Sequence, residues 1–191
     1  MRWTIEVAID LRSMMKPRPM VPVKSVPRWR PPDQDSVKIN VDAAFYRDAA
    51  VGAAGAIIRD HLGAMIRSQA LWYEHAMDPL VLEAKALRDG VQLACNLGLQ
   101  KVQLETDSLG LVNLWNGTGQ NRSIISAICQ EVKELIRSFT SFSLSYVSKL
   151  ANQAAHVCAK QASESRRRYL WVNYNPLFLA RILSKDCNLI V

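Results

Sequence analysis

The chain contains little cysteine, little glycine and few aromatic residues, and it lacks a long apolar run. Of 191 residues, four are cysteine, eight are glycine and 7% are aromatic. The cysteines are widely spaced and form no Cys-x-x-Cys pair, which argues against a disulfide framework or a zinc site. No apolar run reaches the roughly 18 residues of a membrane span, and Glu6 and Asp10 interrupt any signal-peptide core. We therefore expect an intracellular protein, nuclear or cytoplasmic, that contacts no membrane.

Basic residues outnumber acidic residues, and the excess lies at the two ends of the chain. The 24 Lys and Arg residues exceed the 17 Asp and Glu residues by seven. Residues 1–36 hold seven basic and four acidic residues, residues 164–191 hold five and two, and residues 37–163 hold twelve and eleven. Basic flanks fit contact with nucleic acid, because Lys and Arg displace counterions from phosphates. An effect on solubility explains the same pattern equally well.

Proline divides the chain into parts. Six of the eight prolines lie between residues 17 and 32, a composition typical of an extended linker. We predict that residues 1–36 form a disordered N-terminal segment rich in Pro and Arg. Residues 37–163 are predicted to form one folded domain, followed by a basic and apolar tail at 164–191 that packs back on it.

The spacing of apolar residues predicts strands followed by an alternation of helices and strands. The predicted strands are 37–46, 51–59, 64–73, 101–106 and 142–147, and the predicted helices are 80–97, 108–115, 122–138 and 151–166. This order indicates an α/β fold with a five-stranded mixed sheet, in which three antiparallel strands precede two parallel ones. Helices are expected to flank the sheet.

The second predicted strand, residues 51–59, is rich in small residues and contains Gly52 and Gly55. Glycine within a strand often marks the close approach of another backbone or of a ligand. Tight packing of a helix on that face of the sheet is an equally good explanation. The sequence leaves both open.

Two acidic residues occupy unusual positions on the predicted strands. Asp42 lies in the middle of the strand 37–46, although strands are depleted in aspartate. Asp107 directly follows the strand 101–106, where ligands of open α/β sheets gather. Converging acids repel one another unless a cation neutralises them. Because oxygen ligands suit Mg²⁺ or Mn²⁺, the pattern predicts a divalent metal site.

A third acid, Glu83, lies near the start of the predicted helix 80–97. At about 100° per residue, Glu83 falls within the apolar arc of this helix, between Gly90 and Ala94. Burial of an unpaired carboxylate is costly, so this position favours a charged partner or a metal. A half-exposed glutamate stabilised by the helix N-terminal dipole explains the position equally well.

The order of elements and the three acids together resemble the ribonuclease H fold. The local motifs resemble more narrowly the plant reverse-transcriptase-associated ribonuclease H family, whose members occur in or derive from non-LTR retrotransposon polyproteins. The motifs are VKINVDAAF at 37–45, EAKALRDG at 83–90 and ETDS at 105–108. Further matches lie at residues 53–60 and 147–160, and the resemblance covers about residues 29–163.

This resemblance implies a metal-dependent endonuclease that hydrolyses the RNA strand of RNA–DNA hybrids. It implies that two Mg²⁺ or Mn²⁺ ions about 4 Å apart contact the scissile phosphate. The implied catalytic and metal-binding residues are Asp42, Glu83, Asp107 and His156. Asn40 is a further candidate ligand at the outer site. We expect a monomer whose partner is nucleic acid.

Two positions depart from the pattern of active ribonucleases H. His156 stands where they carry a fourth metal-binding carboxylate, and imidazole is a poor ligand for Mg²⁺. Tyr146 stands where they usually carry a histidine. These departures keep a second hypothesis open, in which the chain is a domesticated nucleic-acid-binding module of retroelement origin that cleaves weakly or not at all.

Overall fold

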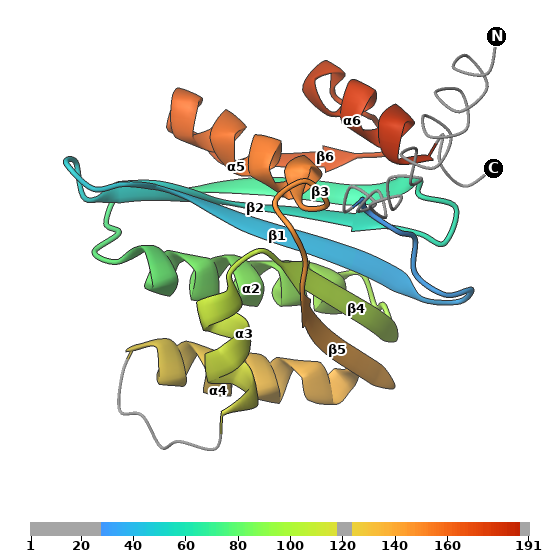
Figure 1. Cartoon of the computed structure of the whole chain (residues 1–191), viewed down its shortest axis with the longest axis horizontal. Helices are drawn as coiled ribbons and strands as arrows, with labels where there is room; N and C mark the ends of the chain where they lie inside the picture. The colour runs from blue at the N-terminus through green and yellow to red at the C-terminus, as the bar shows by residue number, and fades with distance from the viewer. Residues whose placement is uncertain (1–27, 118–123, 188–191) are drawn as a thin grey trace, which may run out of the picture.

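A mixed β-sheet with helices on both faces forms the centre of the protein (Figure 1). The structure is a computed structural model that describes residues 28–117 and 124–187. The predicted N-terminal segment therefore lies outside the described residues as far as residue 27. The strands are β1 (Val37–Tyr46), β2 (Val51–Arg59), β3 (Met65–Tyr73), β4 (Lys101–Thr106), β5 (Ser141–Tyr146) and β6 (Tyr169–Val172). The helices are α2 (Pro79–Asn96), α3 (Leu109–Asn116), α4 (Ile124–Leu135), the 3₁₀ turn η1 (Ile136–Ser138), α5 (Gln153–Ser165) and α6 (Leu177–Cys187).

The strands lie in the order β5-β4-β1-β2-β3-β6. The pairs β1–β2 and β2–β3 are antiparallel, whereas β1–β4 and β4–β5 are parallel. The predicted arrangement, three antiparallel strands followed by two parallel ones, is therefore confirmed. The turn between β2 and β3 is closed by a hydrogen bond from the Gly63 N–H to the Asp60 carbonyl, 3.0 Å, at the predicted position.

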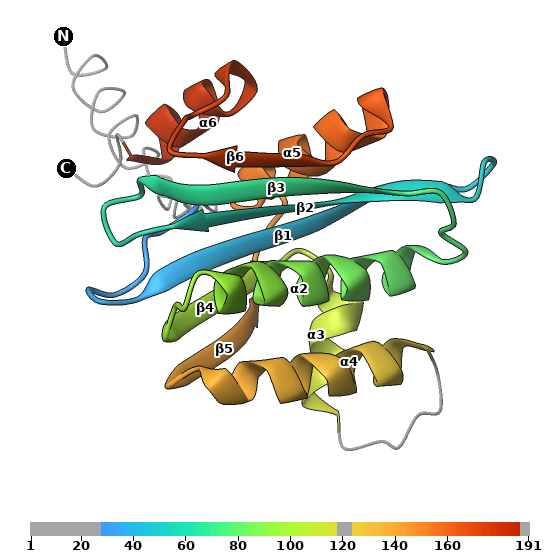
Figure 2. The same ribbon diagram turned by 180° about the vertical axis from the view of Figure 1, so that it is seen from behind.

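The predicted strand count of five is wrong, because the tail contributes β6. This strand pairs antiparallel with the outer edge of β3. The helix α6, which follows β6, buries Leu179 and Leu183 in the core on the same face of the sheet as α5. The apolar tail thus packs back on the sheet as expected, and it does so as a strand and a helix (Figure 2).

Two separate apolar cores lie on the two faces of the sheet. On one face α2 packs on β1 and β2, with α3 and α4 beyond it. On the other face α5 and α6 cover β2, β3 and β6. The strands β4 and β5 lie beyond the part of the sheet that α5 covers (Figure 1).

Gly55 on β2 permits the close approach of α5. A Cβ at this position would lie 2.4 Å from the Ala159 nitrogen and 2.5 Å from the Ala155 carbonyl oxygen, which are both backbone atoms of α5. No side chain fits there without moving the helix. Helix packing therefore explains this glycine, and a ligand is not needed. The contact holds α5 against β1 and β2, which positions the first turn of α5 beside Asp42.

A buried polar network joins both flanks of the domain to β1 and β2. The Arg59 side chain is fully buried and lies 2.8 Å from Asp186 of α6. Its guanidinium also stacks 3.5 Å from the ring centroid of Trp29 and donates to Asn40 Oδ1 at 2.9 Å. Trp29 itself is only 3% exposed. Residues on both sides of 37–163 therefore contribute to the folded core, although the predicted domain boundaries remain predictions.

All four cysteines are free, two of them buried. None of the described helices is long and apolar enough to cross a membrane.

Candidate metal centre

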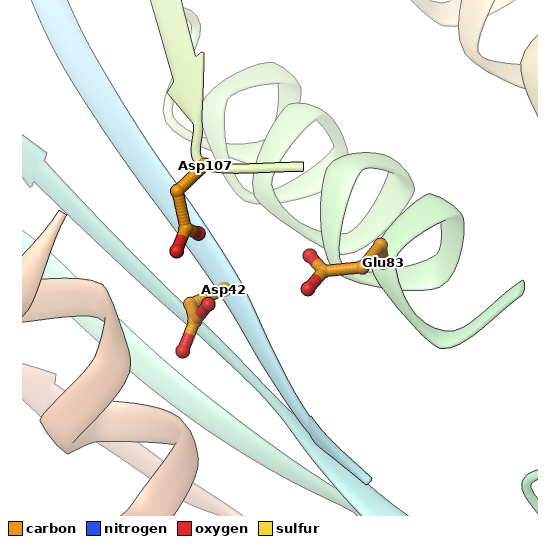
Figure 3. Close-up of side chains that lie close together, drawn as sticks. All are labelled: Asp42, Glu83 and Asp107. Atoms are coloured by element: carbon orange, nitrogen blue, oxygen red, sulfur yellow. The ribbon is translucent and has the colours of Figure 1, made fainter. Parts of the chain in front are cut away.

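Asp42 and Asp107 lie side by side because β1 and β4 are parallel neighbours. In the register of these strands Val41 is opposite Thr106, and the residue that follows each of them is an aspartate, Asp42 or Asp107. Asp42 still belongs to β1, and Asp107 lies in the turn before α3. Glu83 approaches both from α2, with its carboxylate pointing toward them (Figure 3). Elements far apart in the sequence thus bring the three predicted acids to one point.

One carboxylate oxygen from each of Asp42, Glu83 and Asp107 lies within 4.8 Å of the others. The acids line a cavity of about 590 Å³. The other lining residues include the start of α2 (Pro79, Leu80), the loop before α5 (Lys149, Leu150, Asn152) and His156. The site therefore opens to solvent between the β5–α5 loop and the start of α2, with room for a ligand beside the acids.

Glu83 is the most strongly perturbed of the three acids. Burial, reinforced by the negative charges of Asp42 and Asp107, raises the pKa of Glu83 to about 9. A hydrogen bond from the Ala43 backbone and the charge of Lys149 offset only part of this rise. Glu83 Oε2 is buried and has no hydrogen-bond partner among the described residues. Of the two explanations that the sequence left open, the structure favours a largely buried acid beside two other acids over a half-exposed glutamate stabilised by the helix N-terminus.

Asp42 and His156 form a close pair. His156 Nδ1 lies 2.8 Å from Asp42 Oδ2, and Asp42 is 7% exposed whereas His156 is 58% exposed. Burial raises the pKa of Asp42, and the hydrogen bond with His156 offsets part of this rise. The same hydrogen bond raises the pKa of His156. His156 is therefore present at the site, where the neighbouring carboxylates favour the protonated form of its imidazole.

Asn152 holds the two acid-bearing strands together, a role that the sequence did not reveal. Its Nδ2 donates to Asp107 Oδ1 at 2.8 Å and to the Val41 carbonyl at 2.9 Å. The side chain is almost completely buried. The only local signal was its place directly before a helix, where an asparagine side chain is expected to cap the helix. Asn152 does not cap α5 with its side chain, and its contacts join residues 111 and 45 positions away.

Asn40 does not contribute to the acidic cluster, so the suggestion that it completes an outer metal site is wrong. Its Oδ1 accepts from Trp29 Nε1 at 3.0 Å and from Arg59, and its Nδ2 donates to Glu105 at 2.9 Å. Both polar atoms are thus engaged in the buried network. Asn40 lies on the same strand as Asp42, but Trp29 and Arg59 bind its side chain.

The residues at the cavity fit a divalent cation. Three carboxylates supply hard oxygen ligands, and Glu83 Oε2 has no hydrogen-bond partner among the described residues that would compete with a cation. Asp42 and Asp107 are fixed by hydrogen bonds to His156 and Asn152, as ligands of metals usually are. The set lacks thiolates, so it is unsuited to ions that prefer sulfur.

Asn152→Ala is expected to weaken the binding of Mn²⁺ by about ten- to a hundredfold. Outer partners of metal ligands contribute effects of this size, and the substitution frees the Asp107 carboxylate. The affinity is measured by calorimetric titration of the full chain. Asn113→Ala, which changes an exposed asparagine of α3 outside the cavity lining, is the control and should bind Mn²⁺ as the parent does. Equal affinities in all three proteins would show that Asn152 does not position a metal ligand.

The sequence model of the reverse transcriptase-like family matches residues 40–162 of this chain. This region contains all four predicted site residues, and it ends before β6 and α6. No curated protein sequence matches the chain.

Solved structures of ribonucleases H share the fold. The ribonuclease H1 of the halophilic archaeon Halobacterium salinarum NRC-1 is 19% identical with a TM-score of 0.64, over 68% of this chain and 98% of that one. The N-terminal ribonuclease H domain of a Mycobacterium tuberculosis protein is 18% identical with a TM-score of 0.58, over 69% and 99%. LC11 ribonuclease H1, isolated from compost and solved in complex with an RNA/DNA hybrid, is 14% identical with a TM-score of 0.59, over 69% and 99%. The predicted ribonuclease H-like fold is confirmed.

Proposed function

Because this chain belongs to the reverse transcriptase-like family and has the ribonuclease H fold, we propose that it hydrolyses the RNA strand of RNA–DNA hybrids. The observation that carries this proposal is the convergence of Asp42, Glu83 and Asp107 beside an open cavity. One structural neighbour was solved with an RNA/DNA hybrid, which supports the choice of substrate. The cleavage is endonucleolytic and depends on Mg²⁺ or Mn²⁺.

In this proposal Asp42, Glu83 and Asp107 hold two divalent cations, with His156 as an additional ligand or proton carrier. When bound, these cations supply positive charge at the scissile phosphate, activate water for attack and stabilise the leaving oxygen. Asp42 would hold a cation together with Glu83 and Asp107, and its contact with His156 would bring that side chain to the same site. Glu83 binds a cation as the ionised carboxylate, so occupation of the site releases its proton.

Substrate choice in this proposal depends on the shape of the duplex and on the RNA 2′-hydroxyl groups. A-form duplexes present a wide, shallow minor groove with the 2′-hydroxyls exposed, and proteins read such duplexes mainly by shape. The cavity is lined by polar side chains and also by the apolar Leu80 and Leu150, which suit contact with sugars. We therefore expect little dependence of cleavage on base sequence.

The proposal is tested with a labelled RNA–DNA hybrid incubated in Mg²⁺ and in Mn²⁺. The expected result is cleavage of the RNA strand alone, lost in Asp107→Asn and absent with double-stranded DNA or RNA. Loss of activity on adding a chelator would support the metal requirement. Cleavage that survives Asp107→Asn would mean that the activity comes from another site or a contaminant.

His156→Asp is expected to raise the rate in Mg²⁺ relative to the rate in Mn²⁺ by about tenfold or more. A carboxylate at this position supplies the hard oxygen ligand that Mg²⁺ prefers, whereas imidazole suits transition metals. The two rates are measured on the same hybrid. His75→Asp, which changes an exposed histidine in the loop after β3, is the control and should leave the ratio unchanged. An unchanged ratio in His156→Asp would exclude His156 as a metal ligand.

A second candidate function is binding of nucleic acid without cleavage. The contact of His156 with Asp42 favours it, because the histidine already engages one of the carboxylate oxygens that a metal would use. The two functions differ in their need for metal. A binding module retains affinity for the hybrid in a chelator and leaves the RNA strand intact, whereas the enzyme cuts only when Mg²⁺ or Mn²⁺ is added.

A further inference from the structure

Lys149 carries a positive charge at the edge of an otherwise acidic cavity. It lies in the loop between β5 and α5 and lines the same cavity as Asp42, Glu83 and Asp107. Among the described residues that line this cavity, it is the only lysine or arginine. Its charge reaches the site, because it lowers the pKa of Glu83 against the larger effect of burial.

The loop that carries Lys149 is bonded to both acid-bearing strands. On one side the Val147 N–H donates to the Thr106 carbonyl at 2.9 Å, next to Asp107. On the other side Asn152 Nδ2 donates to the Val41 carbonyl, next to Asp42. The Asn152 N–H also donates to the Lys149 carbonyl at 3.2 Å. The backbone of Lys149 is therefore held at a defined position relative to the acids.

The Lys149 side chain, by contrast, is not used to hold the fold together. The residue is exposed. Within residues 28–117 and 124–187 its ammonium group is in no ion pair, whereas Lys38 and Lys160 each pair with a glutamate. A lysine side chain is long and flexible and presents three donors on a point charge. It can thus reach a ligand in the cavity without breaking an existing contact.

A nucleic acid that enters this cavity meets three carboxylates. Cations at the site neutralise the scissile phosphate, but the neighbouring phosphates of the strand remain charged. A lysine beside the cavity offers attraction for one of them, as lysines commonly do in nucleic-acid complexes. Leu150, the next residue of the loop, also lines the cavity and is apolar.

We propose that Lys149 is a substrate-binding residue that contacts a phosphate of the hybrid adjacent to the one that is cleaved. This inference rests on the proposed function, since it takes the hybrid as the ligand. Lys149 touches no reacting atom in this arrangement. Its contribution is to the affinity for the strand and to the position of the strand over the acids.

The experiment measures binding of a labelled RNA–DNA hybrid in Mg²⁺ by fluorescence anisotropy at several salt concentrations. The full chain with Glu83→Gln is used throughout, so that the hybrid stays intact and Lys149 cannot act through the charge of Glu83. In this background Lys149→Gln is compared with Lys149→Arg. Lys101→Gln is the matched control, because Lys101 is also exposed and begins β4, at the end opposite Asp107.

Removal of one phosphate contact is expected to reduce the slope of log affinity against log salt by about 0.9. Between about 50 and 200 mM salt, this amounts to roughly a threefold smaller loss of affinity. Lys149→Arg and Lys101→Gln should keep the parent slope. In the otherwise unchanged enzyme, Lys149→Gln should raise KM and leave kcat nearly constant, as loss of uniform binding does.

These measurements distinguish failure of the role of Lys149 from failure of the proposed function. If the parent binds and the unchanged enzyme cleaves the hybrid, yet Lys149→Gln behaves as Lys101→Gln does, the role of Lys149 is wrong and the proposed function stands. If Lys149→Gln lowers kcat and leaves the salt slope unchanged, Lys149 acts on the acids and not on a phosphate, and the inference is again wrong. If the parent neither binds nor cleaves the hybrid, both the inference and the proposed function are wrong.

Discussion

Glu83→Gln is expected to lower the rate of RNA cleavage by more than about a hundredfold and, without metal, to make the protein more stable. The loss of rate follows from removal of a metal ligand, because even the outer partners of such ligands contribute about ten- to a hundredfold. The gain in stability follows from the environment of this carboxylate. It is buried beside Asp42 and Asp107, and Oε2 has no partner among the described residues. A neutral amide removes the free-energy cost of holding this carboxyl group protonated in the folded protein.

The gain depends on pH in a defined direction. The pKa of Glu83 rises from 4.5 to about 9 on folding without metal. The folded protein therefore keeps a proton that the unfolded chain releases, so the free energy of unfolding falls as pH rises from about 4.5 to 9. Glu83→Gln removes this contribution, and Tm near pH 8 should rise by about 3 °C or more.

These effects are measured by cleavage assays and by thermal unfolding in a chelator at several pH values. Glu164→Gln is the control, because Glu164 is 59% exposed and its one ion-pair partner within residues 28–117 and 124–187 is Lys160, on the surface of α5. It should change neither the rate nor the pH dependence of Tm. Retention of full cleavage by Glu83→Gln would refute the site assignment. A Tm that falls at pH 8 would show that the carboxylate is stabilised in some other way.

The largest expected loss of stability is at Asp186. Asp186→Ala leaves the fully buried Arg59 guanidinium without its carboxylate, and breaking a buried ion pair costs about 3–5 kcal/mol. For a chain of this size the cost corresponds to a fall in Tm of roughly 6–20 °C. Asp186 belongs to α6, so the effect measures how strongly this helix is integrated in the fold.

Two further variants test whether the loss of stability in Asp186→Ala comes from the unpaired buried charge of Arg59. The double variant Arg59→Met with Asp186→Leu should recover most of the lost stability, because apolar residues of similar volume can replace a buried pair. Glu164→Ala breaks the exposed pair with Lys160, 3.6 Å apart, and should cost less than about 1 kcal/mol. Equal small losses in Asp186→Ala and Glu164→Ala would mean that the Arg59–Asp186 contact does not stabilise the protein.

The Arg59 network also bears on the extent of the domain. The family match spans residues 40–162, yet Arg59 contacts Trp29 before this region and Asp186 after it. A protein cut to the matched region would expose β3 along the edge that β6 covers and would leave Arg59 unpaired. Experiments on activity therefore require the longer chain.

The elements that could be predicted were those with a clear local pattern. The strand Val37–Tyr46 and the helix Pro79–Asn96 were found within one residue at their ends, because their apolar residues repeat with the period of a strand or a helix. The four-residue strand Tyr169–Val172 was missed. So short a run carries little periodicity, and it becomes a strand because the edge of β3 supplies its hydrogen-bond partners.

The sequence by itself determined the order of the first five strands and of the helices among them, and it singled out the three acids, because an acid in a strand or on an apolar helix face conflicts with its local surroundings. Only the tertiary structure decided which polar neighbours join those acids. Asn40 forms hydrogen bonds with Trp29 and Arg59, whereas Asn152 donates hydrogen bonds to the Val41 carbonyl and to Asp107. Hydrogen bonds between residues that are distant in sequence leave no local pattern, so the choice of partner is made only when the elements pack.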